Sequence, residues 1–273
     1  MPSWPRTDLA LVNRTLAVRH APGAASNLPT AVFVHGLGGS ALNWTDLMAR
    51  LTGYVDGWAV DLPGFGGSPP PRDGDLSPLG HARAIMDLVE HLDAGPVHLF
   101  GNSLGGSVGV QVAARRPDLV ASLTLVSPAL PALFATRANI HLPVVAVPGI
   151  GERLVARYLR ADAAGRVGGT ISVTFADPSR VTRARVDEAI AEVREHDRMP
   201  YASDAFLRSL RGLLATFVDR GPDRPWRLAE RVECPTLLVY GRADPLVDSR
   251  SAYRATRHFR HANVVVLPDC GHV

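Results

Sequence analysis

The chain contains no lysine, only two cysteines and no long hydrophobic run. Its 29 basic residues are all arginines and are scattered, so no basic stripe with interleaved aromatic residues favours nucleic-acid binding. The longest apolar candidate, residues 142–150, contains two prolines and falls short of the about 20 residues that a membrane-spanning helix needs. Cys234 and Cys270 lack the spacing of a structural zinc site, and we expect two buried thiols. These absences argue against nucleic acid, stable membrane insertion and a metal site.

The N-terminal residues also lack the uninterrupted apolar core of a secretory signal, because Asp8, Asn13 and Arg14 break the pattern. We therefore expect a cytoplasmic protein. With 273 residues, 46% of them hydrophobic, the chain is long enough for one large core and an inserted subdomain.

Two stretches of the chain alternate between short β-rich runs and helical patterns. The runs lie at residues 30–34, 58–60, 97–100, 123–126, 236–240 and 264–267, and the helical patterns at 42–51, 79–92, 103–115 and 249–259. This alternation predicts an α/β fold with a mostly parallel sheet flanked by helices. Residues 10–20 alternate around a turn-like Asn13-Arg14 pair, which predicts an antiparallel hairpin at the sheet edge.

The middle of the chain, residues 131–230, differs in character. It offers one possible strand at residues 170–175 and otherwise has apolar residues at helical spacing, so we expect a mainly helical insertion. Its 15 arginines against 12 acids would attract an anionic membrane. Without a compact cluster of four or more basic side chains, we expect that attraction to be small.

Residues Gly101 to Gly105 read Gly-Asn-Ser-Leu-Gly, between a predicted strand and a predicted helix. A sharp turn of this kind needs small residues on both sides of the serine and exposes the Ser103 hydroxyl. It also places the Leu104 N–H at a helix N-terminus, where a developing oxyanion is stabilised. The motif predicts a nucleophilic serine, whereas a tight turn without chemistry is the simpler alternative.

In three motifs the chain resembles the α/β-hydrolase family. Residues 35–39 (His-Gly-Leu-Gly-Gly) are similar to its oxyanion motif, residues 61–68 to its Asp-x-Pro-Gly-x-Gly-x-Ser turn, and residues 101–105 to its nucleophile motif. The resemblance implies a hydrolase core over residues 1–130 and 231–273, with residues 131–230 as a cap. It further implies that the Leu37 N–H is the second oxyanion donor, and that His35 and Gly36 support the motif rather than react.

The same resemblance places a catalytic acid and a histidine after the cap. Asp244, just after a strand, matches the acid position, and His272 matches the histidine. A base and an orienting carboxylate are what a serine hydroxyl needs to become a nucleophile. Asp248 and Asp269 are the competing carboxylates, and each is more simply explained as a cap or turn residue.

Serine at position 103 favours acyl transfer over the aspartate chemistry of the family's dehalogenases and epoxide hydrolases. We expect an esterase that needs no cofactor and acts on a small hydrophobic substrate, with cap residues Phe134, Leu154, Tyr158, Phe206, Leu213 and Phe217 as candidate pocket residues.

The Gly-Asn-Ser-Leu-Gly-Gly form is also similar to carbon–carbon bond hydrolases of aromatic ring-opening products. Those enzymes carry a tryptophan after the histidine, where this chain has Val273, and a proline in the oxyanion loop. A third alternative is a non-catalytic ligand receptor, because fold alone does not define function.

The chain departs from the family at its end. Family members continue for about a helix beyond the histidine, whereas this sequence stops at Val273. Either the sequence is a fragment or His272 is held loosely, as unanchored end residues usually are. We therefore expect weak activity from the 273-residue form and higher activity once native downstream residues are added.

Overall fold

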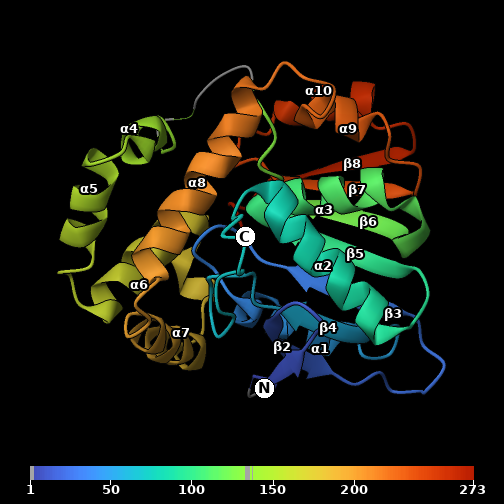
Figure 1. Cartoon of the computed structure of the whole chain (residues 1–273), viewed down its shortest axis with the longest axis horizontal. Coiled ribbons are helices and arrows are strands. Elements are labelled where there is room, and N and C mark those ends of the chain that lie inside the picture. Colours follow the sequence, from blue (N-terminus) through green and yellow to red (C-terminus); the bar gives the residue numbers. More distant parts are fainter. Residues whose placement is uncertain (1–2, 133–135, 137) are drawn as a thin grey trace.

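A computed structural model describes residues 3–132, 136 and 138–273. Its centre is an eight-stranded sheet with the order β1-β2-β4-β3-β5-β6-β7-β8 (Figure 1). The strands are β1 Arg6–Ala10, β2 Thr15–Ala21, β3 Thr30–Val34, β4 Asp56–Val60, β5 Val97–Asn102, β6 Val120–Val126, β7 Thr236–Gly241 and β8 Ala262–Leu267. All neighbouring pairs from β4 to β8 are parallel, while β1 and β2 form an antiparallel hairpin at one edge. The predicted fold class and hairpin are thus confirmed.

Strand β3 explains why the sheet is covered on both faces. Its five residues are all buried, and successive side chains of a strand point to opposite faces. Val32 and Val34 join the large core cluster formed with helices α2 (Pro78–Leu92) and α3 (Leu104–Arg115), whereas Ala31 and Phe33 pack with Trp44 and its neighbours on the other face. Burial on both faces is typical of parallel strands and gives their continuous apolar runs.

Helices follow most of the parallel strands and pack on the two faces. In the N-terminal part these are η1 Ala41–Trp44, α1 Thr45–Leu51, α2 Pro78–Leu92, α3 Leu104–Arg115 and η2 Pro117–Leu119, and near the C-terminus α10 Ser251–His258. Helix α3 contacts β3, β5 and β6 and therefore lies over the middle of the sheet. This position matters because α3 starts directly after Ser103.

Between β6 and β7 the chain is mainly helical, and we use the name inserted segment for residues 131–230 of this stretch. Its described helices are α4 Leu142–Ala146, α5 Ile150–Tyr158, α6 Ala163–Thr174, η3 Pro178–Arg180, α7 Arg183–His196, α8 Ala202–Val218 and α9 Pro225–Ala229. Helices α4 to α8 lie to one side of the sheet, and α9 packs on α3 (Figure 1). The expected strand at residues 170–175 is wrong, because residues 170–174 are the last part of α6 and Phe175 is its C-cap; the buried side chains of this helix, Ala163, Arg166 and Val167, have helical spacing.

No described helix is long and apolar enough to cross a membrane. Cys234 and Cys270 are free thiols, but both are half-buried rather than buried as expected. Each lies in a loop beside a strand of the sheet, and Cys234 packs against the large core cluster.

Candidate active site

Ser103 occupies the sharp turn between β5 and α3. Its φ of 53° and ψ of −115° are values that side-chain-bearing residues rarely adopt. Main-chain hydrogen bonds hold it there: the Ser103 N–H donates to the Val126 carbonyl over 3.0 Å, and its own carbonyl accepts from Ala129 over 2.9 Å. The end of β6 and the residues that follow it therefore hold Ser103 in this strained conformation.

Glycine is required around this turn by close backbone contacts. A Cβ added at Gly101 would lie 2.3 Å from the Gly105 carbonyl oxygen, and one added at Gly105 would lie 2.2 Å from the Val34 oxygen. Real Cβ atoms do not approach oxygen so closely. The two glycines of the motif thus let the start of α3 approach both β5 and β3.

His272 and Asp244 form a buried pair at the carboxyl end of the sheet. His272 Nδ1 lies 2.9 Å from Asp244 Oδ2, and only 5% of His272 is exposed. The other carboxylate oxygen of Asp244 accepts the N–H groups of Leu246 and Val247 over 2.8 and 2.9 Å. Burial raises the pKa of Asp244, but its hydrogen bond to His272, the charge of that imidazole and the N–H donors outweigh burial and hold the pKa below its usual value. The carboxylate is therefore charged and fixes Nδ1–H as the donor.

The loops of Ser103 and His272 are joined through the residue next to the serine. Asn102 Nδ2 donates to the His272 carbonyl over 3.2 Å and to the Val126 carbonyl over 3.1 Å. The structure thus brings His272 directly to Asp244 and connects the Ser103 turn to the His272 main chain. Sequence reasoning named Asn102 only as part of the motif and missed this contact.

The chain around His272 is anchored to the inserted segment. The His272 N–H donates to the Thr174 carbonyl over 2.7 Å, and a Cβ on Gly271 would lie 2.4 Å from the same oxygen. The Cys270 carbonyl accepts the Ala243 N–H over 3.0 Å, which ties this loop to that of Asp244. A loosely held His272, one of the two expected alternatives, is not what the structure contains.

His35 is a structural residue of the loop at the end of β3. It is fully buried; Nδ1 lies 2.7 Å from the Gly36 carbonyl oxygen, and Nε2 accepts the Leu62 N–H over 2.9 Å. These two bonds require the neutral imidazole with its proton on Nδ1, and burial lowers its pKa accordingly. His35 thus locks the loop of Gly36 and half-buried Leu37 to the turn that follows Asp61. Gly36 lies close to the serine, because a Cβ there would be 3.1 Å from Ser103 Cβ.

Helix α7 of the inserted segment reaches the same loop. Glu192 Oε2 accepts a hydrogen bond from the Ser40 hydroxyl over 2.7 Å, directly after the loop of residues 36–39. Burial raises the pKa of Glu192, and the Ser40 bond and the charge of Arg19, 3.6 Å away, only partly offset it. From α8, the Phe206 ring lies 3.5 Å from where a Cβ of Gly38 would be. The inserted segment therefore contacts the loop that carries Leu37, a connection that no sequence motif indicated.

Other expected residues lie away from this cluster. Asp248 accepts the Arg250 N–H over 2.9 Å, which fits its interpretation as a turn residue. Leu154 and Tyr158 are exposed rather than buried against the core. Phe134 lies outside the described residues. Among the residues that the structure describes, no group of three His, Cys, Asp or Glu side chains has the arrangement of a metal site.

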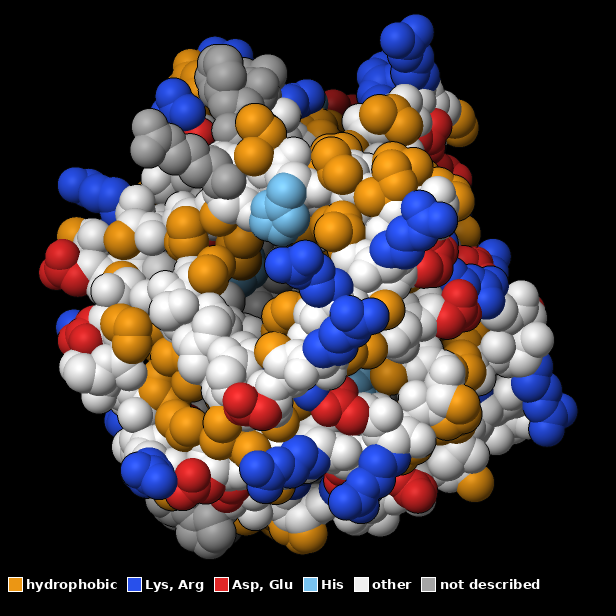
Figure 2. Space-filling model, turned by 90° about the vertical axis from the view of Figure 1, so that its left-hand side faces the viewer, with side chains coloured by type: hydrophobic (Ala, Val, Ile, Leu, Met, Phe, Trp, Pro, Cys, Tyr) orange, Lys and Arg blue, Asp and Glu red, His pale blue; other side chains and the backbone are white. Residues whose placement is uncertain are grey.

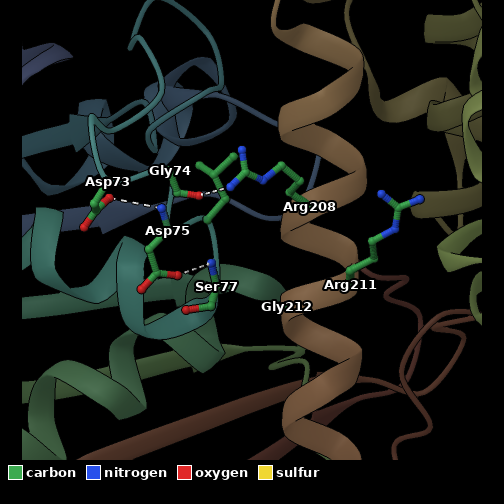
Figure 3. Close-up of a pocket in the computed structure, with 8 residues that line it drawn as sticks. Asp73, Gly74, Asp75, Ser77, Arg208, Arg211 and Gly212 are labelled. Carbon is green, nitrogen blue, oxygen red and sulfur yellow. Dashed lines mark hydrogen bonds between the residues drawn. The ribbon is translucent and has the colours of Figure 1, made fainter. Parts of the chain in front are cut away.

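A groove of about 450 Å³ lies between α8 and the loop before α2 (Figure 3). Arg208 and Arg211 come from α8, and Arg208 donates to the Gly74 carbonyl across the groove. On the loop side, Asp73 and Asp75 accept main-chain N–H groups of the loop itself. The eight lining residues do not include Ser103, Asp244 or His272. The groove therefore marks a contact between the inserted segment and the core rather than the candidate active site.

A mostly parallel sheet with a serine on a strained strand-to-helix turn and a buried His–Asp pair at the same edge is typical of a hydrolase. The chain belongs to the family with the alpha/beta hydrolase fold, whose model matches residues 29–273. The predicted family is thereby confirmed.

Three relatives show the range of this family. The chain is 30% identical to the dihydrolipoyllysine-residue acetyltransferase component of the acetoin cleaving system of Pseudomonas putida, covering 89% of this chain and 58% of that protein. It is 28% identical to the 2-hydroxy-6-oxononadienedioate/2-hydroxy-6-oxononatrienedioate hydrolase of Klebsiella pneumoniae, covering 95% and 85%. It is 27% identical to monoacylglycerol lipase abhd6-B of Xenopus laevis, covering 92% and 72%. The chain thus spans little more than half of the first relative and most of the other two.

Proposed function

We propose that this protein is a serine hydrolase that cleaves carboxylic esters of a small hydrophobic substrate. The observation that carries the proposal is the buried His272–Asp244 hydrogen bond, joined through Asn102 to the strained turn of Ser103. In this proposal Ser103 is the nucleophile, His272 the general acid and base, and Asp244 the group that orients the imidazole. No metal or organic cofactor takes part.

The tautomer of His272 determines the order of proton transfers in the proposed reaction. Because Nδ1–H is committed to Asp244, the lone pair of Nε2 accepts the Ser103 proton as Oγ attacks the ester carbonyl. The imidazolium then gives this proton to the leaving alkoxide, which departs as the alcohol and leaves an acyl-serine. Water, deprotonated by the same imidazole, attacks the acyl-serine and releases the acid and free Ser103.

The oxyanion of each tetrahedral intermediate is assigned to two main-chain N–H groups. Leu104 is the first residue of α3, so its N–H has no partner within the helix, and the helix dipole favours negative charge there. Leu37 supplies the second N–H from the loop that His35 and Gly36 support. Each donor of this kind contributes roughly 10²–10³-fold in kcat.

Residues 131–230 are proposed to be a cap that selects the substrate. Phe206 on α8, which packs over Gly38 beside the proposed oxyanion donor, favours an apolar acyl group. The likeness to a monoacylglycerol lipase supports an ester substrate.

The test uses p-nitrophenyl acetate and butyrate together with a fluorophosphonate probe. We expect the wild type to turn over both esters and to be labelled, and Ser103→Ala to lose at least about 10³-fold of the rate and all labelling. Ser172→Ala, on the exposed side of α6, is the matched control and should behave as the wild type. A folded wild type that neither hydrolyses ester nor reacts with the probe would favour the non-catalytic receptor instead.

Carbon–carbon bond hydrolysis is the second candidate, favoured by the likeness to the 2-hydroxy-6-oxononadienedioate hydrolase. Against it stand Val273 in place of a tryptophan after the histidine and the absence of proline from residues 35–39. Turnover of a dienone acid without turnover of simple esters would select this candidate.

A further inference from the structure

Helix α5 presents its larger apolar side chains to solvent. Ile150, Leu154 and Tyr158 are spaced by four residues, so they form one stripe along the helix, and their exposed fractions are 43%, 40% and 53%. Gly151, directly after Ile150, is buried against α8, because a Cβ there would lie 3.0 Å from Leu207 Cδ2. The stripe therefore leaves a large part of its apolar surface uncovered, although the Tyr158 ring also lies 5.7 Å from the guanidinium carbon of Arg166.

Arginines border this stripe. Arg153 and Arg157 are also four residues apart and lie beside Leu154 and Tyr158 on the helix surface, and Arg160 follows one turn later. All three are exposed, and no described acidic residue forms an ion pair with them. The nearest acid in sequence, Glu152, is bound to Arg211 of α8 over 2.7 Å. The border of the stripe therefore carries uncompensated positive charge.

The apolar surface continues onto α4, which packs against α5, and onto the residues that flank α4. Ile140, Val144 and Val147 are 66%, 51% and 42% exposed. Figure 2 looks onto this side of the molecule and shows hydrophobic side chains interspersed with basic ones over the inserted segment. We call the six apolar residues and three arginines together the α4–α5 face.

We propose that the α4–α5 face docks on an anionic membrane surface. Exposed bulky apolar residues beside arginines match a lipid interface, where the apolar side chains enter the acyl boundary and the guanidinium groups meet the headgroup phosphates. The sequence alone suggested only a small electrostatic attraction. What it did not reveal is that three of the arginines lie along an exposed apolar stripe.

The positive charge of the three arginines favours an anionic membrane over a second copy of the chain as the partner of the α4–α5 face. A two-fold contact would place the same patch against itself and bring the arginines of one copy near those of the other. An anionic surface neutralises them instead. The proposal goes beyond the proposed catalysis and does not depend on it.

The experiment is co-sedimentation of the full chain with vesicles of phosphatidylcholine alone or mixed with phosphatidylglycerol. We expect binding to the anionic vesicles, little binding to the neutral ones, and release by high salt because exposed charges are then screened. Arg153→Gln/Arg157→Gln should weaken binding about tenfold or more. Leu154→Asn/Tyr158→Asn should weaken it by a similar factor, because apolar surface is no longer buried.

Arg220→Gln/Arg260→Gln is the matched control, since it removes the same charge at exposed positions outside the α4–α5 face. It should bind as the wild type does. Ser103→Ala should bind unchanged, and hydrolysis of p-nitrophenyl acetate by the α4–α5 variants should stay within about twofold of the wild type, which reports that they are folded. Equal binding by all variants, or a wild-type dimer that Leu154→Asn/Tyr158→Asn dissociates, would overturn the proposal. A wild type that binds vesicles without hydrolysing esters would leave it standing and refute the proposed catalysis alone.

Discussion

Asn102 Nδ2 donates to the carbonyl oxygen of His272 over 3.2 Å, across 170 positions of the chain. The side chain next to the proposed nucleophile thereby holds the main chain of the proposed base. Since the same amide group donates to Val126 on β6, it fixes the His272 loop relative to the sheet.

Asn102→Ala removes this link without touching any reacting group. We expect kcat for p-nitrophenyl butyrate to fall about tenfold, because a small displacement of a positioned catalytic group is costly, while KM changes little. Steady-state kinetics measures both constants. Asn263→Ala, at an exposed position on β8, is the control, and an unchanged kcat for Asn102→Ala would remove Asn102 from the positioning of His272.

Asp244→Asn keeps the size of the side chain but removes its charge. An amide that donates to Nδ1 would favour the wrong tautomer of His272, so we expect kcat to fall by roughly 10³–10⁴-fold. The fluorophosphonate labelling rate should fall in parallel. Asp248→Asn, on the neighbouring turn, should retain nearly all activity; a comparable loss in both variants would contradict the assigned role of Asp244.

Gly105→Ala tests the close approach of α3 to β3. The new Cβ would lie 2.2 Å from the Val34 oxygen, so we expect a loss of more than about 3 kcal/mol in the free energy of unfolding, or failure to fold. Gly168→Ala inside α6 meets nothing within 4 Å and should stabilise the protein by about 0.5–1 kcal/mol. Urea unfolding compares the two; a Gly105→Ala variant as stable as the wild type would contradict the packing described here.

Glu192→Gln tests the buried carboxylate on α7. Because burial raises the pKa of Glu192 in the folded state, that state binds more protons than the unfolded chain between the two pKa values, and stability falls as pH rises through this window. The cost is roughly 1.4 kcal/mol for each unit by which the pKa is raised. Glutamine cannot ionise, so we expect the variant to lose less stability than the wild type between about pH 5 and about pH 8.

Urea unfolding at both pH values measures this difference. Glu233→Gln, at an exposed position, should retain the pH dependence of the wild type. If Glu192→Gln retains it too, the carboxylate is not the group that titrates in this window.

Much of the fold could be predicted from local sequence pattern. The spacing of the apolar residues agrees with the observed strands and helices, and so do the proline and glycine residues that end most of the apolar runs. Strand β3 has the predicted bounds, since its apolar run lies between Pro29 and the His35-Gly36 turn. The strand prediction for residues 170–175 failed because their β-branched side chains favour a strand locally. In the structure, the helix whose side chains Arg166 and Val167 are buried on one side extends to Thr174.

Part of the candidate site could likewise be predicted from the sequence, and part could not. His272 and Asp244 could be paired from motifs that follow two strands, and the structure brings them together. The contacts of Asn102 with His272 and of Ser40 with Glu192 join residues 170 and 152 positions apart and leave no pattern in the sequence. Leu154 and Tyr158 were expected in the pocket because small-molecule pockets are mostly lined by apolar side chains, and here both are exposed.

The hydrogen bond from the His272 N–H to Thr174 has a practical consequence for engineering. A chimera that exchanges residues 131–230 for those of a relative, in order to alter selectivity, would also replace Thr174, whose main-chain carbonyl holds the His272 loop in place. Grafts that begin after residue 176 would retain that acceptor, and a loss of turnover in wholesale exchanges would then trace to a displaced base rather than to a poorly shaped pocket.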